Sequence, residues 1–423
     1  MNFPIYALAV AALFFCACSN SEGEVSIASV AHPAQKKYLP LNDTEYPYAG
    51  IPRIVIETDN KAEVKDRETE IPAKLQIWGE HAPESEVMDL TIRGRGNSTW
   101  DMPKKSYKIE FIDKQSMLGM PKERDWALIA NHADKTLMKN YLAYRLSADL
   151  GAYYSPRCEF AELYLNREYL GVYQLTETIK IGKNRIRVPE PSKTFLVEID
   201  AKYREDEHVY FTNLGKALNI HYPKELKSLT QDTLISFVNN FESYVQLMEQ
   251  YKTLSVDRWI DVDEYIRHYW IQEFTKNLDA NFYTSVYFTW AIDGRIFMGP
   301  VWDFDLAFGG HNTEKDRLPS EYRLRDHYWN KYLFADADFL QKSRDFWNAH
   351  KSVFYSVLDS IDHYLAVLEK AAKNNFKRWD ILQSVNNLHH PKAYDSYDEA
   401  VQDLKNWTAE RFNWIDQEQD LDN

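Results

Sequence analysis

Gly299-Pro-Val-Trp-Asp-Phe-Asp-Leu-Ala-Phe-Gly-Gly310 places two carboxylates, Asp303 and Asp305, between an apolar run and a Gly-Gly break. If the backbone here is an extended strand end, residues two apart point to the same side. Such a pair repels unless a cation or arginines lie between the two groups, and oxygen-only ligation of this kind suits Mg²⁺. Trp302 and Phe304 flank Asp303, and a buried carboxylate needs a partner. The stretch therefore predicts a metal site in preference to a turn with solvated aspartates.

Length and composition limit the possible classes. The chain has 423 residues, enough for one large domain or two ordinary ones with a sizeable core. Aromatic residues make up 14% of it, which argues against disorder. The net charge of -14 argues against a nucleic-acid partner, since phosphate backbones would be repelled.

The N-terminus is typical of an exported protein. Residues 5–17 form an apolar run too short to span a bilayer, which predicts a signal peptide over 1–17. Small Ala17 precedes Cys18 as in a bacterial lipobox, so we expect lipidation of Cys18 and a flexible tether over 18–48. An ordinary secretory signal is the alternative. The expected location is the cell envelope, as a membrane-anchored lipoprotein on the periplasmic or outer side. The remaining cysteine, Cys158, is expected to be a small core residue.

The first half of the sequence is rich in strand patterns. Arg53–Thr58, Ala73–Trp78 and Asp89–Arg95 alternate apolar and polar residues with a period of two, and Pro103–Phe111 follows the same pattern. Further along, 160–165 and 169–175 predict a hairpin, and 195–200 predicts another strand. In between, Asp134 is placed to cap a helix that ends near residue 151.

The turn between the third and fourth strands combines glycines with positive charge. Gly94 and Gly96 lie in it, and a turn of this kind offers backbone N–H groups to an anion. The side chains that we expect to contact phosphate here are Arg93, Arg95, Asn97, Ser98, Lys105 and Lys108. The turn matches neither the Walker pattern nor G-x-G-x-x-G, and a hairpin with a solvated basic rim is an equally good interpretation of this segment alone.

After about residue 228 the pattern becomes helical. Helices are expected over 229–250 and 261–276, followed by a hairpin with its turn at Asp293-Gly294. A hairpin returns the chain to its starting point, so Asp279, Asn281 and Asp303 are expected to converge. Asp279 alone would be an ordinary helix-end residue, but beside a second acidic segment it becomes a catalytic candidate. The fold class predicted is α+β, with a β-rich lobe at about 49–225 and a mainly helical lobe at about 226–420.

Several of these motifs occur together, in an order that resembles the CotH family of spore-coat atypical protein kinases. The motifs are Arg93–Trp100 with Pro103–Phe111, Ala133–Tyr141, Glu162–Gln174, Asn277–Asp279 and Gly299–Gly309. The resemblance covers about 50–420. It implies a divergent two-lobed protein-kinase-like fold over 49–420 that transfers phosphate from ATP to Ser or Thr with Mg²⁺ or Mn²⁺.

By this resemblance, Asp279 matches the catalytic aspartate and Asp303 the metal-binding aspartate, with Asn281 and Asp305 as further metal ligands. The nucleotide-side lysine is either Lys108 or Lys105, and Glu177 is its expected ion-pair partner. The expected acceptor is an extracytoplasmic protein, basic and Ser-rich.

Two other functions remain open at this point. One is a cell-surface binding or adhesion module that uses the same fold without catalysis; the paired acidic residues argue against it. The other is a metal-dependent transferase that uses another phosphate or glycan donor. Metal-dependent nucleotide binding separates the first from a kinase, and donor screening separates the second.

Overall fold

The computed structural model describes residues 39–204, 207–225, 228–248, 251, 254–386 and 390–421. The expected signal peptide, Cys18 and most of the tether lie outside these ranges, so all three stay predictions. Residues Pro40–Asn423 form one unit. Within the described ranges, no helix is long and apolar enough to cross a membrane.

Seven strands close into a barrel in the order β1-β2-β3-β4-β5-β7-β6, with β1 and β6 paired in parallel and the other pairs antiparallel. Their bounds are β1 Arg53–Thr58, β2 Ile71–Trp78, β3 Met88–Arg95, β4 Ser106–Gln115, β5 Glu123–Ile129, β6 Cys158–Leu165 and β7 Glu168–Glu177. Alternate residues of these strands point inward, and Ile54, Leu75, Ile109 and Leu163 are fully buried there. The barrel is therefore a filled core, and ligands have to bind at its ends or sides.

A second sheet of five strands lies beside the barrel in the order β12-β11-β8-β10-β9. Its strands are β8 Thr194–Ile199, β9 Val209–Phe211, β10 Ala217–Tyr222, β11 Val286–Ala291 and β12 Ile296–Met298. β11 and β12 form the expected hairpin, with Phe288 opposite Met298. β8, β9 and β10 precede the lobe boundary expected near 225 and β11 and β12 follow it, so that boundary falls between strands of one sheet.

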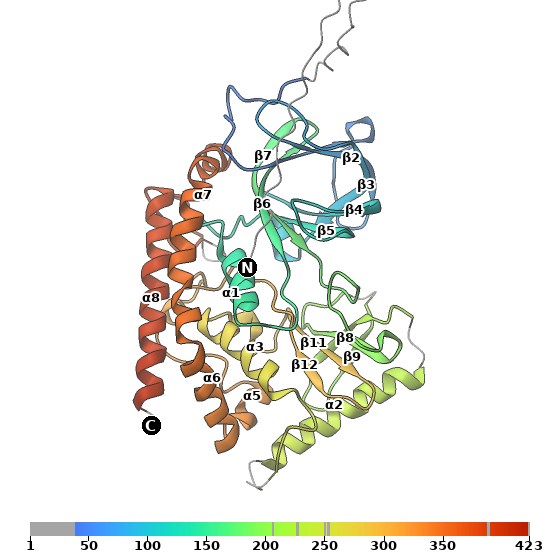
Figure 1. The fold of residues 1–423 in the computed structure, drawn as a ribbon, viewed down its shortest axis with the longest axis vertical. Helices are drawn as coiled ribbons and strands as arrows, with labels where there is room; N and C mark the ends of the chain where they lie inside the picture. Colours follow the sequence, from blue (N-terminus) through green and yellow to red (C-terminus); the bar gives the residue numbers. More distant parts are fainter. Residues whose placement is uncertain are drawn as a thin grey trace, which may run out of the picture. The chain divides into compact units, whose positions relative to one another are not determined.

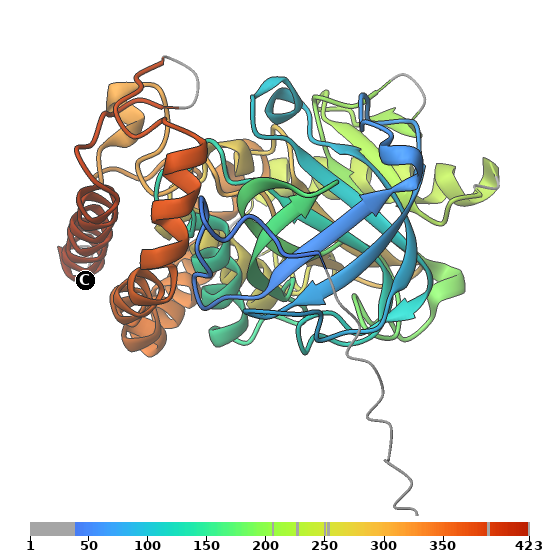
Figure 2. The same ribbon diagram turned by 90° about the horizontal axis from the view of Figure 1, so that it is seen from above.

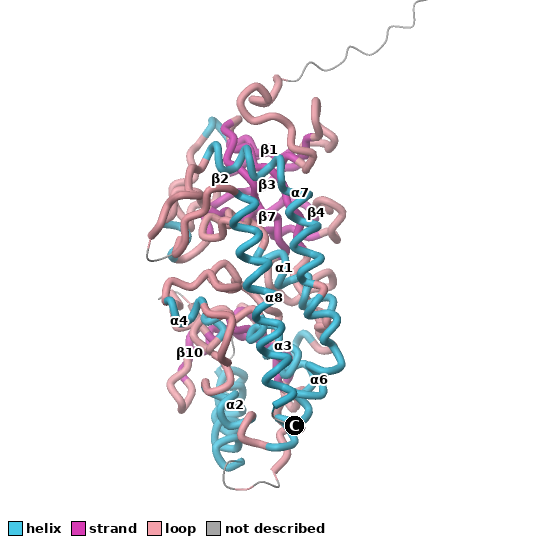
Figure 3. The backbone as a smooth tube through the Cα atoms, turned by 90° about the vertical axis from the view of Figure 1, so that its left-hand side faces the viewer, coloured by secondary structure: helices cyan, strands magenta, loops and turns pink. Residues whose placement is uncertain are grey.

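The helices pack around this sheet and along one side of the barrel (Figures 1 and 2), where α7 and α8 lie next to each other. Their bounds are α1 Lys139–Asp149, α2 Ser228–Met248, α3 Val262–Phe274, α4 Glu314–Arg317, α5 Tyr328–Leu333, α6 Ala337–Tyr355, α7 Val357–Arg378 and α8 Tyr397–Leu421. Helix α3 contacts both α6 and α8, and Figure 3 shows the three helices close together, with α2 below β10 of the second sheet. Phe237 of α2 stacks on Trp290 of β11 with 4.6 Å between the ring centroids.

Helix α3 is the central element of this half, because nearly all of its side chains are buried. Asp261 caps its N-terminus by accepting a hydrogen bond from the Glu264 N–H at 3.1 Å. Its C-terminal end leads directly to Asn277 and Asp279. Burial on all sides fixes this end of the helix, and so fixes the position of the turn that carries Asp279.

The expected α+β class, with a β-rich first part and a mainly helical second part, is confirmed. Cys158 is a buried free thiol, as expected of a core residue. One local expectation is wrong: β12 ends at Met298, so the backbone at Asp303 is not a strand end. Asp134 does stabilise the start of α1, since its carboxylate accepts the Lys139 N–H at 2.9 Å.

Candidate active site

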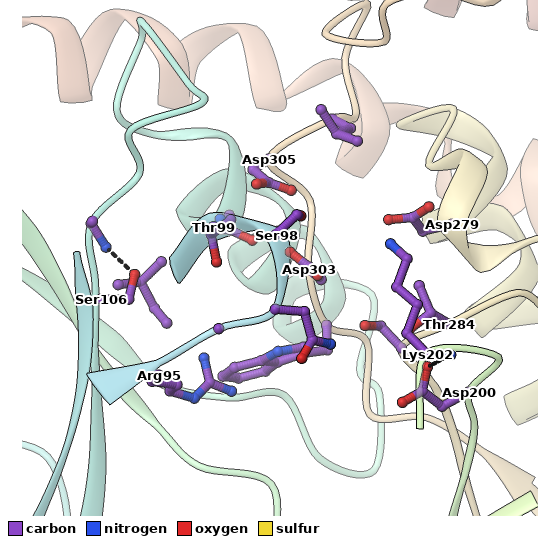
Figure 4. Close-up of a pocket in the computed structure, with 18 of the residues that line it drawn as sticks. Arg95, Ser98, Thr99, Ser106, Asp200, Lys202, Asp279, Thr284, Asp303 and Asp305 are labelled. Carbon is purple, nitrogen blue, oxygen red and sulfur yellow. Dashed lines mark hydrogen bonds between the residues drawn. The ribbon is translucent and has the colours of Figure 1, made fainter. Parts of the chain in front are cut away.

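A cavity of about 400 Å³ lies between the β3–β4 end of the barrel and the second sheet. Its charged and titratable lining includes Arg67, Arg93, Arg95, Lys104, Glu198, Asp200, Lys202, Arg204, Glu207, His221, Asp279, Asp303 and Asp305. Figure 4 shows Asp303 and Asp305 on one stretch of loop, with Asp279 and Lys202 across the cavity from Arg95. Opposite charges thus face each other around one open space.

The acidic turn at 302–305 has an unusual backbone. Asp303 has φ +64°, in the left-handed region that side chains other than Gly and Asn rarely adopt. The same-side prediction for Asp303 and Asp305 assumed extended backbone, and that premise is wrong. The turn is held from both sides: Asn277 donates to the Asp303 carbonyl at 3.0 Å, and Asn140 accepts the Phe304 N–H at 2.8 Å. Backbone strain that neighbouring residues maintain in this way is characteristic of functional sites.

The carboxyl groups of this turn still meet, because the left-handed residue bends the chain so that the two side chains share a hydrogen bond. Burial raises the pKa of Asp303, and the charge of Asp305 together with that hydrogen bond raises it further. Burial also raises the pKa of Asp305, whereas the hydrogen bond to Asp303 lowers it. Two half-buried carboxylates in contact favour either a shared proton or a cation between them.

Asp279 lies in the 3₁₀ turn Leu278–Ala280 that follows α3. Its carbonyl accepts the N–H groups of Tyr283 at 3.3 Å and Thr284 at 3.2 Å, so the turn is tied to the start of the β11–β12 hairpin. Burial raises the pKa of Asp279, as does the nearby charge of Asp303, while Lys202 lowers it. The expected convergence of Asp279 and Asp303 is therefore present in the cavity.

The glycine-containing loop forms the barrel side of the cavity. Gly96 has φ +112°, and a Cβ there would meet the Thr99 hydroxyl at 2.2 Å, so only glycine fits. Arg67 clamps the loop by donating to the Gly96 carbonyl at 2.7 Å. Arg95 lies over the indole of Trp302 at 4.9 Å, directly beside the acidic turn. The loop thus brings a guanidinium next to the carboxylates.

The chain matches a known protein family over most of the segments that line this cavity. The family model described as CotH kinase protein matches residues 92–415, well over half of the chain. The chain belongs to this family.

A curated relative points the same way. Inner spore coat protein H of Bacillus subtilis (strain 168) is 26% identical over 240 residues, which cover 56% of this chain and 63% of that protein. The chain thus matches less than two thirds of the length of this relative. The CotH match includes both the glycine-containing loop and the acidic turn, whereas β1 and β2 of the barrel lie before it.

Four of the residues predicted for the site are not among those that line the cavity. Asn281 ends the turn after Asp279, and its N–H binds the Leu278 carbonyl. Lys105 binds the Trp100 carbonyl and lies over that indole. Lys108 forms ion pairs with Glu110 at 3.0 Å and Asp125 at 3.5 Å.

Glu177 is the fourth of these residues, and its expected ion pair with a lysine of the loop is not found among the described residues. It is fully buried and pairs with Arg157 and Arg185, each at 2.7 Å. The buried Arg185, the partly exposed Arg157 and the Tyr154 hydroxyl occupy both oxygens of this carboxylate.

The sequence prediction missed the contribution of β8. Glu198 and the following Asp200 both line the cavity. Glu198 contacts His221 of β10 at 2.7 Å, and Asp200 accepts the Thr284 hydroxyl at 2.7 Å. The signal was available, because Glu198 and Asp200 stand two apart in Phe195–Asp200, the same spacing that singled out Asp303 and Asp305.

The residues present fit a Mg²⁺ or Mn²⁺ ion that shares its coordination with phosphate. Within the described ranges, no three or more His, Cys, Asp or Glu side chains are grouped to hold a metal by themselves. Mg²⁺ in nucleotide sites usually takes one or two carboxylates and completes its shell with phosphates and water. Asp303 and Asp305 supply such a pair, and burial together with the charge of a neighbouring carboxylate raises the pKa of each.

Proposed function

We propose that this chain is an ATP-dependent protein kinase of the CotH family that uses Mg²⁺ or Mn²⁺ and phosphorylates Ser or Thr of an extracytoplasmic protein. The observation that carries the proposal is the cavity in which Arg95 and the glycine-containing loop face Asp279, Asp303 and Asp305. Cations for phosphate and carboxylates for metal and proton are the parts that phosphoryl transfer needs. Family membership supports the choice of ATP and of a hydroxyl acceptor.

In the proposed reaction, the bond between the γ-phosphorus and the bridging oxygen of ATP breaks, and ADP leaves with the electron pair. A new bond forms between phosphorus and the acceptor oxygen, and the acceptor proton passes to Asp279. Burial and the charge of Asp303 raise the pKa of Asp279, which makes its carboxylate a better proton acceptor than an ordinary aspartate. Asp303 and Asp305 would hold the metal, which supplies charge neutralisation for the phosphate oxygens.

The loop Arg93–Thr99 has the role of holding the nucleotide phosphates in this proposal. Arg93 is half-buried and ion-paired with Glu70 at 3.8 Å, so it shapes the loop. Asn97 and Ser98 are exposed at the cavity edge and present polar groups to a ligand. Arg95 is the member of the set that stands next to the acidic turn. We assign it the contact to phosphate.

The surroundings of the reaction are part of the proposal. We infer a divergent two-lobed kinase-like arrangement, with the barrel as the first lobe and the helical part with its sheet as the second. We also infer a lipid anchor at Cys18, which places the site in the cell envelope near protein acceptors that are basic and Ser-rich. The name of the spore-coat relative supports an envelope or surface location.

The test is transfer of label from γ-labelled ATP to a Ser-rich basic peptide, with Mg²⁺ or Mn²⁺, by the purified chain. Asp279→Ala and Asp303→Ala are each expected to abolish transfer while their thermal unfolding stays close to that of the parent chain. Transfer by either variant removes that residue from the mechanism. If the parent chain neither transfers label nor binds nucleotide in a metal-dependent way, the binding-module function replaces the kinase.

A further inference from the structure

The second sheet contributes a cation to the cavity from the side opposite the glycine-containing loop. Lys202 follows β8 in a tight turn whose backbone is fixed at three points. The Asp200 carboxylate accepts both the Lys202 N–H at 2.8 Å and the Thr284 hydroxyl at 2.7 Å. The Ala201 N–H donates to the Tyr283 carbonyl at 2.7 Å. The base of the Lys202 side chain is therefore held firmly against the segment that carries Asp279.

The side chain of Lys202 extends from this turn toward Asp279 (Figure 4). Its ammonium lies 5.4 Å from the centre of the exposed Tyr283 ring. Lys202 lies near enough to both Asp279 and Asp303 for its charge to affect them, yet no carboxylate lies within ion-pair distance of it in the described part of the chain. Lys202, Asp279 and Asp303 all line the cavity of about 400 Å³, and a further group can enter this space.

The other cations of the cavity wall are already committed, with one exception. Arg67 and Lys104 donate to backbone carbonyls, while Arg93 and Arg204 pair with glutamates. Arg95 lies on the Trp302 ring, and, like Lys202, it has no oxygen acceptor for its charge among the described residues. Two available cations therefore face each other across the acidic turn, one from the barrel and one from the second sheet.

We propose that Lys202 is a phosphate-binding catalytic residue whose ammonium contacts the phosphoryl group in transit, on the Asp279 side, with Arg95 on the other side. This inference rests on the proposed function. As the bond to the bridging oxygen breaks and the bond to the acceptor oxygen forms, charge spreads over the three equatorial oxygens of phosphorus. A fixed ammonium beside these oxygens stabilises that charge, and it also draws the γ-phosphate toward Asp279 and the acceptor hydroxyl.

Lys202 differs from lysines of the outer surface in its position. Lys373, for example, pairs with Glu369 at 2.8 Å on helix α7. Lys202 lines the cavity, and its charge acts on Asp279 and Asp303. Lys373→Met therefore removes the same charge from an exposed lysine far from the cavity lining, and serves as the matched control for Lys202→Met.

The experiment compares the full chain with Lys202→Met, Lys202→Arg and Lys373→Met in two assays. The first is the rate of label transfer at saturating ATP. The second is the ratio of ATP to ADP affinity by calorimetry with Mg²⁺, which measures the γ-phosphate contact without requiring turnover. Lys202→Met is expected to lower the rate by about 100-fold and to lower the ATP preference over ADP by about tenfold. Lys202→Arg is expected to keep part of the transfer rate and part of the ATP preference. Lys373→Met is expected to change neither the rate nor the preference.

Two results overturn the inference in distinguishable ways. If Lys202→Met keeps the transfer rate and the ATP preference of an active parent chain, Lys202 has no phosphate contact and the proposed kinase stands. If the parent chain binds neither ATP nor ADP with Mg²⁺ or Mn²⁺, the proposed function fails and this assignment fails with it. Thermal unfolding of each variant ensures that a lost rate is counted only for folded protein.

Discussion

The acidic turn and Glu177 are both sites where carboxylates are withdrawn from water, and they differ in what surrounds them. Glu177 is fully buried between Arg157 and Arg185, and Tyr154 donates to its second oxygen at 3.0 Å. Asp303 and Asp305 contact each other, and no Lys, Arg or His in the described ranges lies within ion-pair distance of them. A carboxylate whose oxygens are all occupied by neighbouring residues stabilises the fold. A pair of carboxylates in an open cavity, with no cation beside it in the described part of the chain, is available for a ligand.

The comparison also shows why burial alone does not identify a site. The sequence prediction gave Glu177 a functional role as the ion-pair partner of a lysine of the basic loop. In the structure both of its oxygens are occupied by Tyr154 and Arg157, which precede β6, and by Arg185, which follows β7. The acidic turn is stabilised through its backbone, by Asn277 and Asn140, while its carboxyl groups have no cation within ion-pair distance in the described part of the chain. The two regions should therefore respond in opposite ways to loss of a negative charge.

The largest expected effect is on catalysis by Asp303→Asn. Removing one carboxylate from the pair is expected to lower the phosphate-transfer rate by about 10³-fold, the size seen when a preorganised electrostatic group is lost. The free energy of unfolding should stay within about 1 kcal/mol of the parent value, because the Asn amide can donate to Asp305 the hydrogen bond that the two carboxyl groups share in the parent chain. Label transfer and urea denaturation measure the two quantities. A loss of several kcal/mol in stability would place Asp303 in the same structural class as Glu177.

Glu177→Gln should give the reverse result. It leaves two guanidinium groups facing a neutral amide in the barrel wall, and breaking a buried pair costs about 3–5 kcal/mol of unfolding free energy. The transfer rate per folded molecule should stay close to that of the parent chain. Glu168 lies on the same strand as Glu177 and forms an exposed ion pair with Arg378 of α7. Glu168→Gln is therefore the control and should lower the free energy of unfolding by less than about 1 kcal/mol. A folded Glu177→Gln variant without activity would return Glu177 to the active site.

A smaller effect is expected from the cations of the barrel side. Arg95→Met should weaken ATP binding by about tenfold, because Arg95 faces the acidic turn and has no oxygen acceptor for its charge within the described ranges. Lys108→Met should change it by less than about twofold, since Lys108 is committed to Glu110 and Asp125. Calorimetry with Mg²⁺ and ATP gives both affinities. Equal losses in the two variants would restore Lys108 as a nucleotide-side lysine.

The smallest effect concerns pH and the pair of His221 with Glu198. Burial lowers the pKa of His221, but the hydrogen bond and charge of Glu198 raise it by more, so the net shift is upward. The pKa of Glu198 is raised too, because burial outweighs the pairing, so the contact is only partly ionic.

A His with a raised folded-state pKa gives stability that is complete below about pH 6.5 and is lost as pH rises through the folded value. His221→Gln should therefore lower Tm more at about pH 6 than at about pH 8.5. Since His221 is about a third exposed, the free energy of unfolding lost at the two pH values should differ by a few tenths of a kcal/mol at most. Equal losses of Tm at both pH values would show that His221 acts through packing alone.

Much of the fold was predictable, because the strands of the barrel carry their own local pattern. β1 coincides with the predicted Arg53–Thr58, and β2, β3 and the β6–β7 hairpin begin or end within a few residues of the predicted positions. The β11–β12 hairpin followed from its Asp293-Gly294 turn. Period-two alternation and glycine turns are local signals, so the sequence expresses them directly.

The site was predictable only in part. The convergence of Asp279 with Asp303 followed from chain return through a hairpin, which is a local argument. The closure of the barrel and the pairing of β8 with β11 depend on contacts between distant segments, so Glu198, Asp200 and Lys202 could not be placed beside Asp279. The left-handed conformation of Asp303 was also hidden, since it is imposed by Asn277 and Asn140 from other parts of the chain.

We expect the carboxylates of the acidic turn, Asp303 and Asp305, to hold a metal ion together with nucleotide phosphate. The most direct measurement is electron paramagnetic resonance of Mn²⁺ added with ATP to the parent chain, Asp303→Asn and Glu177→Gln. A bound Mn²⁺ signal is expected in the parent chain and in folded Glu177→Gln, and its loss is expected in Asp303→Asn. A Mn²⁺ signal that Asp303→Asn retains at full strength would contradict this expectation.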